Sequence, residues 1–229
     1  MAEYSAQLVS PLRHVRSSST GRGNGAIKAA EYANLGYIIL RGRLGDSEFI
    51  SAVSSVLEAS LPSVPRAVSR FHSGVILWQS PDEWWLICAR TDLQPLVQSL
   101  RHALEGVFSQ VVDNSGGLTA LHLSGTKCLT LLRHLSPYDF DSLSMGQCVS
   151  TVIGKANFTV VRTEHGVTLI FRRSFAMYIW DLIDRAATPY QLDLVDSKST
   201  HDGVFSHLLA STENYSPVRN ISDRWSLEE

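Results

Sequence analysis

The segment that decides the fold reads Val75-Ile76-Leu77-Trp78-Gln79-Ser80-Pro81-Asp82-Glu83-Trp84-Trp85-Leu86-Ile87-Cys88. Apolar runs typical of β-strands lie on both sides of a polar turn. Pro81 presets φ for the first central position of a type I turn, Asp82 is compatible with the second, and Ser80 can hydrogen-bond the turn backbone. The segment therefore predicts a β-hairpin. Because an isolated two-stranded ribbon is barely stable in water, another layer must cover its aromatic surface.

Two adjacent tryptophans, Trp84 and Trp85, lie in the second strand of this hairpin. Side chains alternate between the two faces of a strand, so one indole ring should face the core and the other the opposite side. We expect the second ring either to be covered by a helix or to be offered to another chain. Trp84 and Trp85 are therefore candidate interface contacts.

Helical patterns precede and follow the hairpin. A strand-like run at residues 37–42 leads to the first helix, for which Asp46 is a suitable N-cap, and Thr91 or Asp92 would cap the second helix. The apolar face of each helix follows from the helical period. These faces consist of Phe49, Ile50, Val53, Val56 and Leu57 in the first helix, and of Leu93, Leu96, Val97, Leu100, Leu104 and Val107 in the second.

The same order of elements recurs in the second half of the chain. Strands are predicted at residues 118–123, 149–153, 158–163 and 167–172, and a helix through Leu129, Leu132 and Leu135. Ser174 would cap a closing helix, whose buried face would be Phe175, Tyr178, Ile179, Leu182 and Ile183. A duplicated strand-helix-hairpin-helix unit predicts the α+β fold class with antiparallel sheets, because hairpins join antiparallel neighbours and the helices cover one face.

Composition divides the chain into three parts. We expect an extended N-terminal arm at residues 1–33, an α+β domain at residues 34–187 and a C-terminal tail at residues 188–229. The arm contains a run of Ser, Gly, Arg and Asn that buries too little apolar surface to order itself alone.

The tail carries few structural signals. Residues 197–203 are expected to form an exposed linker. Val204, Phe205, Leu208 and Leu209 could form one short helix, and Tyr215, Pro217 and Trp225 could dock as anchors on a partner.

Charge and cysteine content exclude several classes of protein. The 229-residue chain carries a net charge of -2. It therefore lacks the excess of basic residues that is typical of proteins that bind nucleic acids or membrane surfaces. No apolar run approaches the roughly 20 residues of a membrane span, and no signal-peptide core is seen. Cys88, Cys128 and Cys148 each stand among apolar neighbours, which indicates buried free thiols. We expect a cytoplasmic protein without nucleic-acid or membrane partners.

Motifs for catalysis and for cofactor binding are missing. The glycines at residues 21–25 follow no strand, and the Gly154-Lys155 pair fits a hairpin turn better than a phosphate loop. The histidines are dispersed, so the sequence predicts no metal site. Ser115 and Ser124 lack the flanking glycine spacing of a hydrolase nucleophile. We therefore assign no catalytic, cofactor-binding or metal-ligating residue.

Three charged residues are candidate contacts with a ligand or a partner. Asp113 closes an apolar strand and could orient a ligand, although a turn cap that accepts from nearby backbone amides is the preferred interpretation. Arg172 and Arg173 lie where a strand runs into a helix, and two guanidinium groups there suit carboxylate or phosphate recognition. A structural or intersubunit salt bridge is the preferred role for this pair, because a helix N-terminus is already electropositive.

Several motifs together resemble the gamma subunit of heterotetrameric sarcosine oxidase. They are Ser10-Pro11-Leu12, residues 78–86, Val112-Asp113-Asn114-Ser115, Leu121-His122-Leu123-Ser124-Gly125, Gly154-Lys155-Ala156 and Arg172-Arg173-Ser174-Phe175-Ala176. The resemblance covers roughly residues 8–187. This family is in turn similar to the folate-binding domain of the glycine-cleavage T-protein, an aminomethyltransferase with a duplicated α+β arrangement.

The resemblance implies a non-catalytic subunit of a bacterial complex that oxidatively demethylates sarcosine to glycine. Tetrahydrofolate would accept the one-carbon unit, and oxygen would become hydrogen peroxide. The implied partners are the alpha, beta and delta subunits, which would hold FAD, FMN, NAD and zinc, while this chain would hold no cofactor.

Other functions stay open. The long C-terminal tail departs from the family and leaves room for a related complex, such as N-methylglutamate dehydrogenase. The chain could also be a folate-binding transferase in its own right, in which Asp113 orients the pterin and Arg172 or Arg173 holds a carboxylate. A binding module unrelated to one-carbon metabolism is the third alternative.

Overall fold

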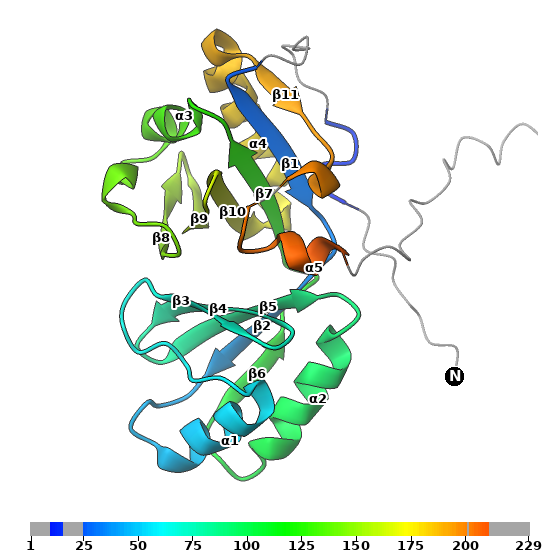
Figure 1. Ribbon diagram of the computed structural model, residues 1–229, viewed down its shortest axis with the longest axis vertical. Coiled ribbons are helices and arrows are strands. Elements are labelled where there is room, and N and C mark those ends of the chain that lie inside the picture. The colour runs from blue at the N-terminus through cyan, green and yellow to red at the C-terminus, as the bar shows by residue number, and fades with distance from the viewer. Residues whose placement is uncertain (1–9, 16–24, 201, 211–229) are drawn as a thin grey trace, which may run out of the picture.

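Two β-sheets packed face to face form the centre of the molecule, and helices cover their outer faces (Figure 1). The computed structural model describes residues 10–15, 25–200 and 202–210. Within these residues, no helix is both long and apolar enough to cross a membrane.

The five-stranded sheet is built from the first half of the chain. Its order is β3-β4-β5-β2-β6, with the strands β2 (Leu35–Arg41), β3 (Val68–Phe71), β4 (Gly74–Ser80), β5 (Glu83–Ala89) and β6 (Gln110–Asp113). All of its pairings are antiparallel. The helices α1 (Ser47–Leu57) and α2 (Leu93–Ala103) cover its outer face, where Phe49, Trp84 and Leu100 are among the buried residues.

The six-stranded sheet draws on both ends of the described chain. Its order is β11-β1-β7-β10-β9-β8, with the strands β1 (Ile27–Tyr32), β7 (Leu118–Ser124), β8 (Cys148–Ile153), β9 (Ala156–Arg162), β10 (Gly166–Arg172) and β11 (Leu192–Leu194). The pairing of β11 with β1 is parallel, and the other pairings are antiparallel. The helices α3 (Cys128–Leu135) and α4 (Ala176–Ala187) cover its outer face.

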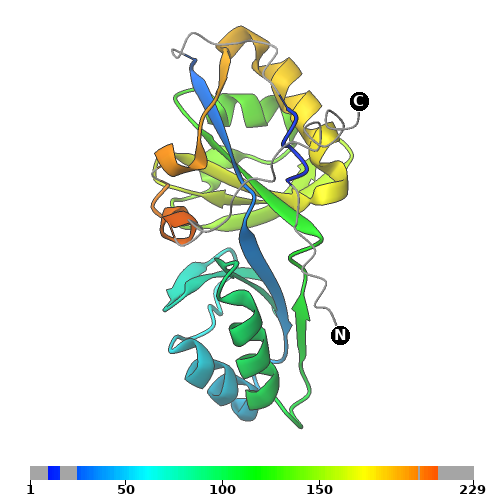
Figure 2. The ribbon, with the colours of Figure 1, turned by 90° about the vertical axis from the view of Figure 1, so that its right-hand side faces the viewer.

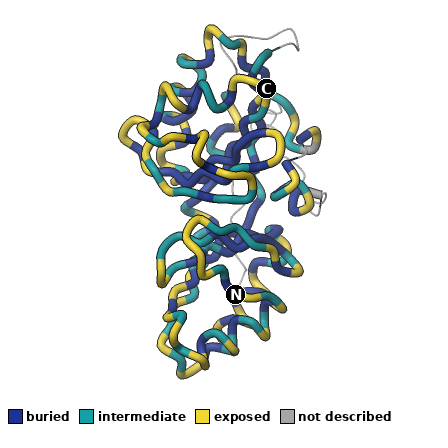
Figure 3. The backbone as a smooth tube through the Cα atoms, turned by 60° about the vertical axis from the view of Figure 1, so that its left-hand side comes forward, coloured by how far each residue is buried: buried dark blue, intermediate teal, exposed yellow. Residues whose placement is uncertain are grey.

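The inner faces of the two sheets enclose a third apolar cluster, which we call the inter-sheet layer. Its buried members are Ala30, Tyr32, Leu35, Tyr37, Val75, Leu77, Ile87, Leu118, Ala120, Cys148, Val161, Ile170, Phe205, Leu208 and Leu209. Figure 3 shows buried residues concentrated in the strands at the middle of the molecule. The α+β fold class with antiparallel sheets is therefore confirmed.

The predicted duplication is present, but each unit contains five strands instead of the three of a strand-helix-hairpin-helix unit. Both halves follow the order strand, helix, three strands, helix, strand: β2 to β6 in the first, and β7 to β11 in the second. Sequence patterns missed β3, which has four residues and only Phe71 fully buried, so that no alternation is visible. The three consecutive strands of each unit form a surface wide enough for the two helices of that unit to pack on.

Two long ribbons join the halves. β1 runs almost directly into β2, and β6 into β7, while β1 pairs with β7 and β2 pairs with β6. Figure 2 shows both ribbons passing from one sheet to the other. β1 precedes residue 33 and β11 follows residue 187, and both belong to the six-stranded sheet, whose other strands lie within the domain expected at residues 34–187. Neither strand gives a strong signal in the sequence, because polar residues interrupt the apolar run of β1 and β11 has only three residues.

The hairpin and the first helix are confirmed, whereas the closing helix is displaced. β4 and β5 pair as predicted around Pro81 and Asp82, and the Asp46 carboxylate accepts from the backbone amides that begin α1. Ser174 is not a cap: it lies in a 3₁₀ turn, Arg173–Phe175, and α4 begins after it. This shift buries Trp180, which was not predicted, and leaves Phe175 37% exposed.

The described part of the tail is integrated into the fold. The short helix α5 (Ser206–Ala210) follows Phe205, and Phe205, Leu208 and Leu209 are buried in the inter-sheet layer. The expected exposed linker is wrong for Thr200 and Asp202, which are both buried. One Asp202 carboxylate oxygen accepts the amides of residues 204, 205 and 206, which fixes the start of α5. Tyr215, Pro217 and Trp225 lie outside the described residues.

Candidate functional site

The two tryptophans of β5 face opposite sides of the five-stranded sheet, as the alternation predicted. Trp84 is fully buried beneath the helices, packs against Phe49 with ring centroids 6.0 Å apart, and donates its indole N–H to the Pro62 carbonyl at 2.9 Å. Trp85 is half-buried against the inter-sheet layer and donates to the Glu83 carboxylate at 2.9 Å. The second sheet covers the Trp85 face, where we expected a helix or another chain.

Asp113 caps a turn. One of its carboxylate oxygens accepts from the Ser115 backbone amide at 2.9 Å, and the other accepts from the Gln94 side-chain amide at 3.2 Å. The Ser115 hydroxyl in turn accepts from the backbone amide of Tyr37 at 2.9 Å. These bonds fix the crossing from β6 to β7, so the turn-cap interpretation of Asp113 is confirmed.

Arg172 and Arg173 stand at the end of β10, where the 3₁₀ turn begins. Arg172 is exposed. The Arg173 backbone amide donates to the Gly117 carbonyl at 2.9 Å, and the positive charge of its side chain favours the ionised form of Glu31. The two arginines therefore differ in setting: Arg173 acts on a partly buried polar group, whereas Arg172 is exposed.

Glu31, which the sequence did not single out, is the centre of that polar group. It accepts hydrogen bonds from the hydroxyls of Ser10 and, at 3.2 Å, Thr119. Burial raises the pKa of Glu31, and these hydrogen bonds and the charge of Arg173 oppose the rise only in part. The contact with Ser10 was not predictable from spacing, because it joins β1 to a segment that precedes the sheet.

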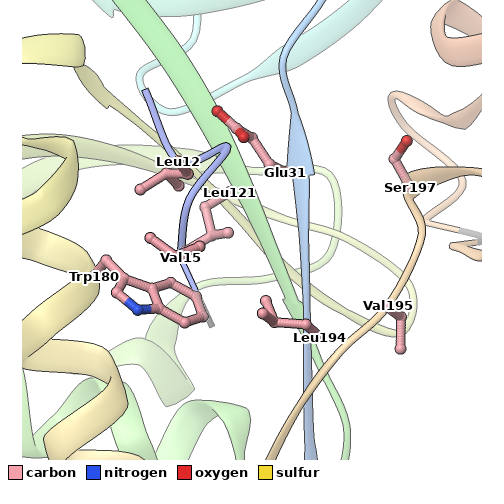
Figure 4. A pocket seen from close by; sticks show the side chains of 8 residues that line it. All are labelled: Leu12, Val15, Glu31, Leu121, Trp180, Leu194, Val195 and Ser197. Carbon is pink, nitrogen blue, oxygen red and sulfur yellow. The ribbon is translucent and has the colours of Figure 1, made fainter. Parts of the chain in front are cut away.

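A cavity of about 230 Å³ adjoins Glu31 on the helix side of the six-stranded sheet (Figure 4). Its lining consists of Leu12, Val15, Glu31, Leu121, Trp180, Leu194, Val195 and Ser197. The walls come from five places in the chain: segment 10–15, β1, β7, α4, and the region from β11 onward.

A second buried polar group surrounds His122 in the six-stranded sheet. Its Nδ1 lies 3.1 Å from the Thr168 hydroxyl and 4.0 Å from the Asp202 carboxylate. The Tyr32 ring stacks on the imidazole at 5.5 Å, and the Tyr32 hydroxyl is hydrogen-bonded to Thr200 at 2.7 Å. Burial lowers the pKa of His122 to about 4, although Asp202 acts in the opposite direction. The imidazole is thus neutral near pH 7. This fits a structural role for His122 rather than a role in proton transfer.

The cysteines are free and buried, as predicted. Burial raises the pKa of the Cys88 and Cys148 thiols to about 12, and it also raises the pKa of Cys128. A thiolate is the reactive form, so these three groups are poor nucleophiles at neutral pH. Across the described ranges, no cluster of three or more His, Cys, Asp or Glu side chains is arranged to hold a metal ion.

Comparison with known proteins identifies the family. The model of the sarcosine oxidase gamma subunit family matches residues 41–188. This chain belongs to the sarcosine oxidase gamma subunit family. The matched range runs from the end of β2 to just beyond α4, so in this member of the family the strands β1 and β11 that complete the six-stranded sheet lie outside it. No curated protein sequence matches this chain.

Solved structures share the fold of this sarcosine oxidase gamma family member. A chain of the heterotetrameric sarcosine oxidase from Corynebacterium sp. U-96, in complex with pyrrole 2-carboxylate, has 23% sequence identity and a TM-score of 0.72, over 80% of this chain and 95% of that chain. The glycine cleavage system aminomethyltransferase T from Bartonella henselae has 14% identity and a TM-score of 0.56, over 75% of this chain and 48% of that chain. The predicted resemblance to both families is confirmed at the level of the fold.

Proposed function

We propose that this chain is the gamma subunit of a heterotetrameric sarcosine oxidase, in which it serves as a non-catalytic structural subunit. The observation that carries the proposal is the family match over residues 41–188. A fold that spans 95% of a chain from such an oxidase agrees with it.

The chemistry of the described polar residues supports a structural role. Asp113 holds a turn, Asp202 holds the start of α5, and His122 is kept neutral inside the molecule. The thiols are protonated at neutral pH because burial raises the pKa values of all three. The Asp113, Asp202 and His122 side chains are thus engaged in holding the fold.

The proposed complex works in the cytoplasm and oxidatively demethylates sarcosine to glycine, with transfer of the one-carbon unit to tetrahydrofolate. Its alpha, beta and delta subunits would carry FAD, FMN, NAD and zinc. The contribution of this chain would be to pack against the large subunits and keep them assembled.

Co-expression with the alpha, beta and delta subunits of a heterotetrameric sarcosine oxidase tests the proposal. The purified complex should contain this chain and should release hydrogen peroxide when sarcosine is added. A complex that oxidises N-methylglutamate and leaves sarcosine untouched would favour the alternative, a subunit of an N-methylglutamate dehydrogenase. An active oxidase that assembles without this chain would contradict the proposal.

A folate-binding, aminomethyltransferase-like protein is the second candidate, favoured by the fold shared with aminomethyltransferase T. In that function Asp113 would orient the pterin, but both of its carboxylate oxygens already accept hydrogen bonds. Titration of the isolated chain with tetrahydrofolate, followed by calorimetry, separates the candidates. Saturable binding would support the folate site, whereas no heat of binding at millimolar concentration would exclude it in practice.

A further inference from the structure

The outer strands of the six-stranded sheet are covered by a short segment in place of a helix. Leu12 is buried and Val15 half-buried against the cluster that α3 and α4 also cover. Six residues cover less surface than a helix of the length of α4, and the space left between segment 10–15, α4 and β11 is the cavity of about 230 Å³. Figure 4 shows Leu12, Val15, Trp180 and Leu194 around this space, with the Glu31 carboxylate at its edge.

The lining combines apolar walls with a single charge. Glu31 is the one titratable side chain among the described residues that line the cavity, and Ser197 supplies a hydroxyl. Leu194 stays 42% exposed, so the apolar wall is open to the surface. Burial raises the pKa of Glu31 in spite of Ser10, Thr119 and Arg173, which means that the negative charge is incompletely compensated. A cation in the cavity would compensate it.

The size of the cavity selects the kind of occupant. Small-molecule sites usually enclose roughly 300–1,000 Å³. A cavity of about 230 Å³ is smaller and suits one long side chain. Arginine and lysine pair an apolar stem with a cationic head, and arginine is enriched among the side chains that anchor protein interfaces. The indole of Trp180 adds apolar wall against which such a stem can pack.

We propose that this cavity is a docking pocket for one arginine or lysine side chain of the partner oxidase subunit, with its stem between Leu12, Leu194 and Trp180 and its cationic head at Glu31. The proposal rests on the proposed function, since it assumes that this chain is a subunit of the complex. It adds the surface and the chemistry by which the partner is recognised.

Two substitutions test the pocket from different sides. Glu31→Gln removes the charge and keeps the shape and one acceptor oxygen, and Leu194→Trp fills the cavity from an exposed position. Each should weaken the affinity for the partner subunits, measured by biolayer interferometry, by about tenfold or more. Glu105→Gln and Val64→Trp change exposed residues of the five-stranded half in the same way and should leave the affinity unchanged. Thermal unfolding of each isolated variant shows whether it is folded.

The outcomes distinguish a failure of the pocket proposal from a failure of the proposed function. If the unaltered chain does not bind the oxidase subunits, the proposed function itself fails. If it binds, and folded Glu31→Gln and Leu194→Trp variants bind equally well, the pocket proposal is overturned while the proposed function stands.

A crosslinking experiment identifies the occupant directly. Benzoylphenylalanine incorporated at position 194 in the assembled complex should capture a partner peptide that contains arginine or lysine close to the crosslink. Capture of residues 211–229 of this chain, or of a second copy of it, would overturn the proposal.

Discussion

A neutral histidine inside the molecule links stability to pH. His122 lies between Tyr32 and Thr168, with the Asp202 carboxylate 4.0 Å away. Desolvation is the main reason that its pKa falls from 6.5 to about 4. The unfolded chain therefore binds a proton at His122 in a pH range where the folded chain does not.

We predict that His122 lowers the free energy of unfolding as the solution becomes acidic. Its contribution to stability is fully present above pH 6.5 and is lost as the pH falls from 6.5 to about 4. The loss should be on the order of 3 kcal/mol. Urea denaturation at intervals across this range measures it. His122→Gln should show a shallower pH dependence than the unaltered chain, and equal slopes for the two would contradict the account.

The two tryptophans of the hairpin should differ in their contribution to stability. Trp84→Phe removes buried volume and the hydrogen bond to the Pro62 carbonyl. It should cost about 2 kcal/mol in the free energy of unfolding. Trp85→Phe affects a half-buried ring and should cost about 0.5 kcal/mol. Urea titrations compare them directly, and a larger cost for Trp85→Phe would show that the packing is misassigned.

Elements with strong local signals were predictable, and those defined by distant contacts were not. The Pro81 turn and the Asp46 cap act within a few residues, so the hairpin and α1 follow from the sequence alone. β3 and β11 have four and three residues and are held by pairing with other strands. α4 was displaced because a 3₁₀ turn, not a side-chain cap, precedes it.

The candidate site shows the same division. The turn-cap role of Asp113 was predicted because it is local: one carboxylate oxygen accepts from the backbone amide of Ser115, two residues further along the chain. Glu31 meets Ser10 and Thr119, and His122 meets Asp202, through contacts between segments far apart in the chain. No spacing rule brings such residues together before the topology is known.

Two aspartates at helix starts provide a matched pair at the scale of an element. Asp46 accepts two backbone amides at the start of α1, whereas Asp92 stands at the N-cap of α2 without a side-chain cap bond. Asp46→Ala should therefore lower the free energy of unfolding by about 1 kcal/mol. Asp92→Ala should change it by less than about 0.5 kcal/mol. Guanidinium denaturation of both variants checks the difference, and equal costs would contradict the assigned caps.

At the scale of the whole molecule, ribbons and tail join the two halves. β1 and β6 each lie next in the chain to a strand of the other sheet, and α5 adds Phe205, Leu208 and Leu209 to the inter-sheet layer. The fold class was predictable from the repeated pattern. The place of β1 beside β7 in the second sheet was not, because it depends on pairing between distant segments.

Truncation tests the role of the tail in the fold. A chain that ends after Ser199 loses the three buried side chains of the tail and the Asp202 carboxylate beside His122. Its free energy of unfolding should fall by roughly 3–6 kcal/mol. A chain that ends after Ala210 keeps these contacts and should be more stable than the shorter chain by this amount. Urea titration distinguishes the two, and equal stability for both truncations would refute the role of the tail.

Native mass spectrometry of the co-expressed complex tests the subunit assignment most directly. The assignment predicts an assembly in which one copy of this chain is bound to the alpha, beta and delta subunits and remains bound through purification. An assembly that contains the other three subunits at full oxidase activity, with this chain found separately, would contradict it.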